Sequence, residues 1–272
     1  MEAKALTARL IGGMALPQGV LLMSEERVAL GYHDAQGRLQ LYTRDLNPHW
    51  ARRAGPAGTL GLLLLESLRA WWRTQQGQGE VRVILAGALA GAPLGLLLRA
   101  QALLPAWQLS LLSLALLALV IGSLYRLYAP FRQALWHSRR YHGAEHMAVY
   151  ALEAGQAMSL EGLRRQPILH PFCGTNLAAL WLMAFPLVLL LPVWLQPLIV
   201  LPLLPVFGWM ARNKDRPLAG KLVAIGYWGQ RYTVAHPEER HLEAALKAVE
   251  GLGLARGVDV CGDAGLVGSA SA

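Results

Sequence analysis

Apolar residues dominate long stretches of this chain, and short polar connections separate these stretches. Several of them approach the roughly 20 residues that a bilayer-crossing helix needs. They are Val83–Leu104, Leu109–Tyr125, Leu177–Leu195 and Pro197–Met210. The short breaks within each successive pair predict two helical hairpins, and the prolines of the last stretch predict that it is broken, tilted or re-entrant. The expected fold is a mainly α-helical integral membrane protein with about four transmembrane helices.

Three shorter patterns lie outside these stretches. Residues 27–46 alternate apolar and polar positions around Gly37, which predicts a small antiparallel β-hairpin. Residues 58–72 are apolar, too short for a span, and end in two tryptophans, so a helix at the membrane interface is expected. Residues 236–253 have helical spacing and a polar face, which predicts an amphipathic helix.

The expected organisation is an N-terminal β-hairpin region (1–56), an interfacial helix (57–80), a first transmembrane hairpin (81–130), a cytoplasmic motif region (131–175), a second transmembrane hairpin (176–211), C-terminal cytoplasmic helices (212–255) and a disordered tail (256–272).

Composition supports this interpretation. Of the 272 residues, 54% are hydrophobic and only 15% are charged, whereas soluble domains average about 25% charged residues. The net charge of +8 is spread over the connections between apolar stretches, which favours contact with membrane lipids and not with nucleic acid. The positive-inside rule then predicts a multi-pass protein of the inner (plasma) membrane with both termini cytoplasmic. Two distant cysteines exclude a disulfide framework, and no cleavable signal peptide is evident.

The stretch "YHGAEH", residues 141–146, carries the candidate chemistry. On a helix, His142 and His146 lie about 40° apart, Glu145 lies about 60° to one side, and Glu153 falls within the same stripe. Histidines at i and i+4 can present their nitrogens to one metal ion, and the glutamate can act as general base toward a bound water. H-x-x-E-H is the inverse of a known metalloprotease motif. The spacing predicts a divalent metal site, with zinc preferred.

A third ligand is needed for such a site. The segment "PILHPFCGT" offers His170 and Cys173, and Glu153 is a further candidate from the same helix as the two histidines. We rank His170 first, Cys173 second and Glu153 third. A solvated polar helix face remains the alternative to a metal site, although the second His/Cys cluster favours metal. The other histidines show no partner spacing and are expected to be structural or exposed: His33, His49, His137, His236 and His241.

Three blocks of the sequence resemble a known family. "YHGAEHMAVYALEAG", "LHPFCGT" and "GYWGQRYTVAHPEERHLEAALKAV" are similar to the best-marked blocks of the bacterial membrane-protein family called domain of unknown function 1385, the YqhQ-like proteins, described as predicted metal-dependent enzymes. The N-terminal "GGMALPQGVLLM" is similar to the opening block of that family. The resemblance implies these motif positions: His142, Gly143, Glu145, His146, Glu153, His170, Pro171, Cys173, Gly174 and Thr175.

The chain also departs from the family pattern. Gln18 stands where the family usually has glutamate, Met14 where it has glutamine, Met147 where it has lysine, and Phe172 where it has arginine. The metal-type residues are all retained while charged neighbours are lost. These differences are compatible with a changed substrate or a weakened activity in this member of the family.

Three functions are compatible with the sequence. The first is a metal-dependent hydrolase acting on a membrane-associated lipid or peptide, with Glu145 as catalytic base. The second is a non-catalytic metal site in a scaffold or sensor, where four ligands close the coordination sphere. The third, less favoured, is a small transporter with a broken fourth span. The sequence leaves the substrate, the metal and the oligomeric state open, and an oligomer is compatible with it.

Overall fold

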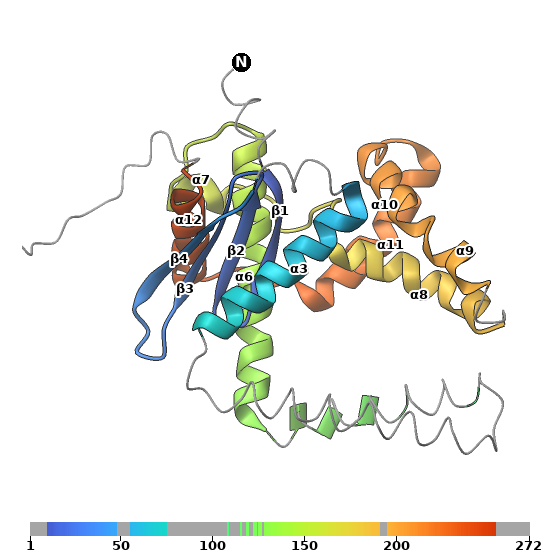
Figure 1. The fold of residues 1–272 in the computed structure, drawn as a ribbon, viewed down its shortest axis with the longest axis horizontal. Coiled ribbons are helices and arrows are strands. Elements are labelled where there is room, and N and C mark those ends of the chain that lie inside the picture. Colours follow the sequence, from blue (N-terminus) through green and yellow to red (C-terminus); the bar gives the residue numbers. More distant parts are fainter. Residues whose placement is uncertain are drawn as a thin grey trace, which may run out of the picture.

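The computed structural model describes residues 10–47, 55–74, 128–190 and 195–253, together with single positions between residues 108 and 126. In these residues a β-sheet lies between helices, and a second group of helices lies beside it (Figure 1). The elements are β1 (Leu10–Leu16), β2 (Gly19–Ser24), β3 (Arg27–His33), β4 (Leu39–Asp45), α3 (Gly55–Thr74), α6 (Ala129–Glu153), α7 (Leu160–Arg164), α8 (Gly174–Leu190), α9 (Gln196–Val200), α10 (Leu203–Arg212), α11 (Pro217–Thr233) and α12 (Glu239–Gly251).

The sheet is an antiparallel meander in the order β1-β2-β3-β4. β3 and β4 form the hairpin expected around Gly37, which has a φ of 78° in the connecting turn. β1 and β2 form a second hairpin, which the sequence did not reveal, with Leu16 paired to Gly19 across the turn. Its strands are apolar on both faces, so the alternation that marks a half-buried strand is missing.

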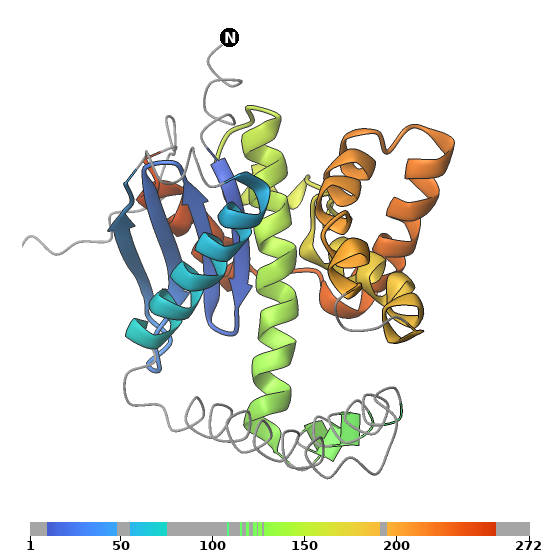
Figure 2. The same cartoon turned by 45° about the vertical axis from the view of Figure 1, so that its right-hand side comes forward.

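Helices cover both faces of the sheet, as Figure 2 shows with α3 in front and α12 behind. On one face, Leu21 and Met23 of β2 pack with residues of α3. On the other face, Val20 and Leu22 pack with residues of α6 and α12. All four of these strand side chains are fully buried. The larger core therefore lies between the sheet, α6 and α12, and it fixes the position of α6.

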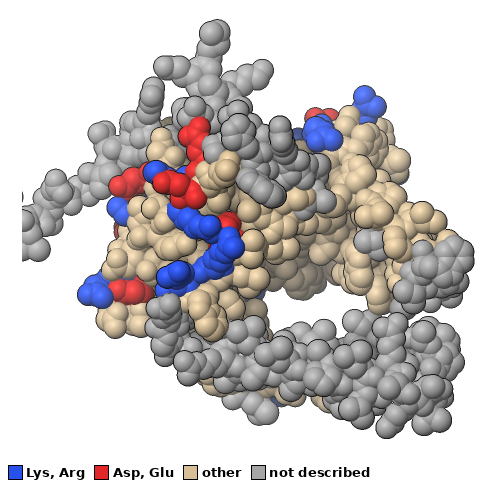
Figure 3. Space-filling model, viewed as in Figure 1, with Lys and Arg blue, Asp and Glu red and all other residues tan. Residues whose placement is uncertain are grey.

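The second group of helices has a small core of its own. Leu180 of α8, Met210 of α10, and Ala219 and Val223 of α11 pack together. Large apolar side chains such as Leu182 remain exposed on this group. In the view of Figure 3 the charged side chains gather mainly over the sheet, while the surface over this group is largely uncharged. The apolar stretches of the sequence here form short helices with exposed apolar faces.

The predicted membrane architecture is wrong for the described part of the chain. Every helix there is too short or too polar to cross a bilayer. The stretch predicted as the second transmembrane hairpin instead forms α8, which has 17 residues with Pro186 inside it, followed by the separate short helices α9 and α10. This finding corrects both the expected α-helical integral membrane fold and the expected multi-pass location in the inner membrane with cytoplasmic termini. The transporter hypothesis depended on those spans and loses its basis with them.

Other predicted segments have mixed outcomes. The helix expected at 57–80 is present as α3, and its Leu63 and Ala70 pack on the sheet. The amphipathic C-terminal helix is confirmed as α12, whose apolar side contributes Leu242 and Val249 to the larger core. Most of the first predicted transmembrane hairpin and the tail at 256–272 lie outside the described residues.

Candidate metal centre

Helix α6 presents His142 and His146 one turn apart on one face, as their spacing predicts. The Nδ1 atom of His142 donates a hydrogen bond to the Thr233 carbonyl oxygen at 3.0 Å. The Nδ1 atom of His146 donates to the carbonyl oxygen of Ile168. A carbonyl can only accept, so each Nδ1 carries the proton and each Nε2 keeps a free lone pair. Metal-binding histidines are usually held in this way.

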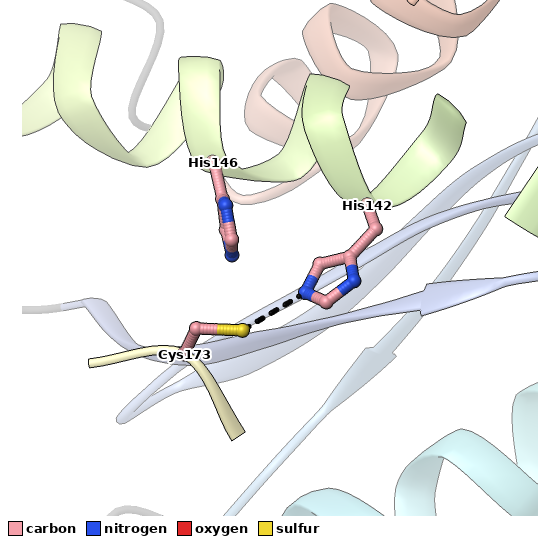
Figure 4. A group of neighbouring side chains, drawn as sticks. All are labelled: His142, His146 and Cys173. Atoms are coloured by element: carbon pink, nitrogen blue, oxygen red, sulfur yellow. Dashed lines mark hydrogen bonds between the residues drawn. The ribbon is translucent and has the colours of Figure 1, made fainter. Parts of the chain in front are cut away.

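Cys173 completes a group of three donors. Its Sγ atom lies 3.2 Å from Nε2 of His142, and the ligand atoms of His142, His146 and Cys173 all lie within 4.8 Å of one another (Figure 4). Around a tetrahedral zinc ion with bonds of about 2.0–2.3 Å, neighbouring ligand atoms are about 3.3–3.7 Å apart. Imidazole nitrogen and thiolate sulfur are the donors that zinc prefers. The residues present therefore fit a zinc ion with small adjustments of their side chains.

Burial controls the protonation of the three donors. It lowers the pKa of His142 and, with the neighbouring His142 and His170, lowers the pKa of His146 to about 3. Burial also raises the pKa of Cys173 to about 11, although hydrogen bonds from Thr175 and Asn176 oppose this. Neutral imidazoles are ready to coordinate a cation, whereas the thiol must lose its proton when a cation binds. Metal binding at this site is therefore expected to release a proton.

Glu145 directly precedes His146 on α6 and is close enough to Cys173 to act on it electrostatically, but it is outside the group of three donors. Its side chain is buried, its carboxylate accepts a hydrogen bond from the backbone N–H of Ala15 in β1, and burial raises its pKa to about 8. The same carboxylate acts on Cys173 electrostatically, raising the pKa of the thiol. Glu145 thus lies where β1, α6 and the Cys173 loop meet.

His170 and Glu153 form a separate pair. The Nε2 atom of His170 lies 3.6 Å from Oε2 of Glu153, and Nδ1 of His170 accepts the backbone N–H of Phe172 at 3.3 Å. Nδ1 of His170 is therefore hydrogen-bonded to the backbone, and Nε2 faces the Glu153 carboxylate. The imidazole ring lies 5.6 Å from that of His146 but does not join the group of three donors. Of the three candidates for the third ligand, the structure brings Cys173 to the two histidines.

Three of the four residues that depart from the family pattern make contacts outside the group of donors. Gln18, in the β1–β2 turn, donates a hydrogen bond to Oγ1 of Thr74 at 2.7 Å. Met147 is buried in the larger core. Phe172 is exposed, and its ring lies 6.2 Å from both His170 and Phe207. None of these three residues is one of the metal-binding candidates.

The structure also gathers histidines that showed no partner in the sequence. His33 of β3, His137 of α6 and His241 of α12 lie around Tyr141. Nδ1 of His137 lies 3.1 Å from Nε2 of His241, and Nδ1 of His33 lies 3.1 Å from the Tyr141 hydroxyl. Only the spacing of His137 and Tyr141 on one helix could have signalled this cluster. The other members come from elements that are distant in the sequence.

The comparisons with known proteins agree with the family resemblance. The family model described as "Protein of unknown function (DUF1385)" matches residues 114–253, which is more than half of the chain. The uncharacterized protein YqhQ of Bacillus subtilis (strain 168) is 28% identical over 155 residues, which cover 52% of this chain. That alignment spans 48% of YqhQ, so the chain covers about half of this relative's length. No solved structure matches the chain.

Proposed function

We propose that this chain, which belongs to the DUF1385 family, is a metal-dependent hydrolase with a zinc or similar divalent ion on His142, His146 and Cys173. One observation carries the proposal: three donors converge, and the buried Glu145, outside their group, acts electrostatically on Cys173. Catalytic zinc sites typically use three protein ligands and keep a fourth position open. A carboxylate next to that position is a suitable general base.

In the proposed hydrolysis, the bound ion, Glu145 and the groups that hold them have separate roles. A bound ion supplies Lewis acidity to the carbonyl group of an amide, ester or similar bond and makes water a better nucleophile. In its deprotonated form, Glu145 accepts a proton from the attacking water and transfers it to the leaving amine or alcohol as the carbon–nitrogen or carbon–oxygen bond breaks. The hydrogen bond from the Ala15 N–H holds the Glu145 carboxylate in place. The carbonyls of Thr233 and Ile168 hold the two imidazole rings.

A closed structural site is the second candidate. His146 is 3% exposed and Cys173 is 5% exposed, and such burial is also typical of a site without a free coordination position. In that case a small movement would bring the Glu145 carboxylate into the coordination sphere as the fourth ligand. The protein would then be a metal-stabilised scaffold or a sensor.

Metal content and turnover in matched variants separate the two candidates. We expect the purified wild type to carry about one transition-metal ion per chain by elemental analysis, and His142→Ala to carry almost none. Glu145→Gln should retain the metal and lose hydrolysis of activated ester and amide substrates if Glu145 is a base. It should lose metal if Glu145 is a ligand. Glu153→Gln, outside the group, is the control that should keep both properties.

The absence of stoichiometric transition metal from the wild type would contradict both the hydrolase and the structural metal site. Full metal retention in His142→Ala would mean that the ion sits elsewhere. An unchanged rate of hydrolysis in Glu145→Gln would remove the general base from the proposal.

A further inference from the structure

Residues 226–235, "GYWGQRYTVA", are part of one of the three blocks that resemble the family. They form the end of α11 and the residues that follow, and they include none of the three metal-binding candidates. We propose that Gln230 of this block and Asn176 of α8 are positioning residues for the metal centre. They hold the loop that carries Cys173 so that its thiol meets His142 and His146. This inference rests on the proposed function.

The loop between α7 and α8 is held mainly by side chains. Four consecutive carbonyl groups, those of residues 168–171, each accept a hydrogen bond from a side chain of α6, α8 or α11. The donors are His146 to Ile168, Tyr150 to Leu169, Gln230 and Asn176 to His170, and Asn176 to Pro171. A loop without such contacts would need water or regular secondary structure for these carbonyls. The side chains therefore determine the path of the loop as far as Cys173.

Gln230 binds both backbone polar groups of His170. Its Oε1 accepts the His170 N–H at 3.0 Å, and its Nε2 donates to the His170 carbonyl at 2.8 Å. The same Nε2 donates to Oδ1 of Asn176 at 2.8 Å, and Nδ2 of Asn176 donates to the Pro171 carbonyl at 2.8 Å. Both amide side chains are 0% exposed. Water cannot replace these bonds readily, so the loop depends on them.

The space for this arrangement comes from Gly226, one turn before Gln230. A Cβ atom at position 226 would lie 2.1 Å from Oδ1 of Asn176, closer than any real contact. Asn176 also contacts Cys173 directly, because its backbone N–H donates to the Cys173 carbonyl oxygen at 2.9 Å and helps to lower the pKa of the thiol. One glycine therefore lets α11 approach α8 at the point where the thiol is held.

The same end of α11 holds a second metal-binding side chain. The Thr233 carbonyl accepts the Nδ1 proton of His142, and the Thr233 hydroxyl lies 2.9 Å from the hydroxyl of Thr175. Thr175 in turn donates its backbone N–H to Cys173 Sγ at 3.4 Å. The segment from Gln230 to Thr233 thus contacts the imidazole ring of His142 and, through Thr175, the surroundings of Cys173. The position of this segment therefore controls the distance between His142 and Cys173.

Cobalt substitution distinguishes positioning from ordinary structural support. Cobalt(II) bound by a thiolate gives a sulfur-to-metal charge-transfer absorption that reports directly on Cys173. We expect the wild type to show this absorption, and Gln230→Met to bind cobalt about 10–100-fold more weakly with a reduced charge-transfer intensity at saturation. Gln230→Glu keeps the size and the Oε1 acceptor but places an oxygen in place of the Nε2 donor, against the His170 carbonyl and Oδ1 of Asn176, so it should weaken cobalt binding and thiolate absorption as well. Val223→Ala, buried elsewhere on α11, is the control that should lower the melting temperature without changing the spectrum.

Each outcome bears on one claim. Cobalt bound to wild type without thiolate absorption, or no binding at all, overturns the proposed function. Normal wild-type absorption with unchanged affinity and spectrum in Gln230→Met overturns the positioning role and leaves the function intact. A Val223→Ala spectrum altered as strongly as that of Gln230→Met also overturns it, because general destabilisation would then explain the effect. If Gln230→Met does not fold, the same comparison is made with Gln230→Glu.

Discussion

The carboxylate of Glu145 lies directly against the backbone of Gly13. A Cβ atom at position 13 would come 2.6 Å from Oε1 of Glu145 and 2.9 Å from Cδ2 of Leu22. Only a residue without a side chain leaves room for the carboxylate beside β1, where the Ala15 N–H donates to it. The opening glycine block and the H-x-x-E-H motif, which are distant in the sequence, therefore form one structural unit.

Gly13→Ala is expected to displace Glu145. Crowding in a packed core typically costs about 1–3 kcal/mol, so the free energy of unfolding should fall by this amount in urea titrations. If Glu145 is the general base, hydrolysis should fall more than metal content does. Gly61→Ala in α3, where a Cβ meets nothing within 4 Å, is the control and should be neutral or slightly stabilising. A Gly13→Ala protein with wild-type stability and activity would show that the contact has no consequence.

Cys173 and His170 should differ in their effect on metal binding. Cys173→Ser removes a donor from the group of three, so metal affinity should fall by more than about 100-fold, beyond the 10–100-fold typical of residues that act through a ligand. His170→Gln should have the smaller effect, because Nδ1 of His170 accepts the Phe172 N–H and Nε2 faces Glu153. Competition with a chelator of known affinity measures both values. The reverse order of effects would place His170 in the ligand set instead of Cys173.

The cluster of His33, His137 and His241 predicts sensitivity to acid. Burial, with nearby positive charge, lowers the pKa of all three, and that of His241 falls to about 3. The charged and titratable groups that face the cluster are Asp34, Arg140, Tyr141 and Arg240. Because the unfolded chain takes up protons first as the pH falls, stability is greatest above pH 6.5 and decreases between pH 6.5 and about 3.

Urea unfolding at several pH values measures this effect. One fully coupled histidine changes the free energy of unfolding by about 1.4 kcal/mol per pH unit. His241→Gln should lower stability at pH 7.5, since it disturbs the α12 capping box, but should flatten the dependence below pH 6.5. The comparison is made on metal-free protein, so that metal release does not contribute. An equal slope in wild type and variant would rule out a role for His241 in acid sensitivity.

Glu66 is expected to contribute more to stability than a typical surface ion pair. It is 1% exposed and contacts Arg44 at 2.8 Å and Arg69 at 2.6 Å, both of which are roughly half exposed. Glu66→Gln removes the charge that both guanidinium groups contact and should cost about 1–3 kcal/mol of unfolding free energy. Glu239→Gln breaks the exposed pair with Arg164 and should cost at most about 1 kcal/mol. Equal losses in the two variants would contradict the importance of burial here.

The sheet and the short helices show why the fold was mispredicted. β1 and β2 are apolar along their length because helices cover both faces of the sheet, so their sequence lacks the alternation of a half-buried strand. The apolar stretch from residue 177 onward has the composition of a membrane span. Whether such a stretch continues as one helix or breaks, as α8, α9 and α10 do, is not encoded in hydropathy alone.

The sequence by itself determined the local part of the candidate site. His142, Glu145 and His146 share one helical face because the α-helix repeats every 3.6 residues, and this holds wherever the helix packs. Only the tertiary structure decided which third donor joins them. Side chains of α6, α8 and α11 set the path of the loop that brings Cys173 to the histidines and leaves His170 with Glu153. Such contacts join residues far apart in the chain, so no periodicity in the sequence records them.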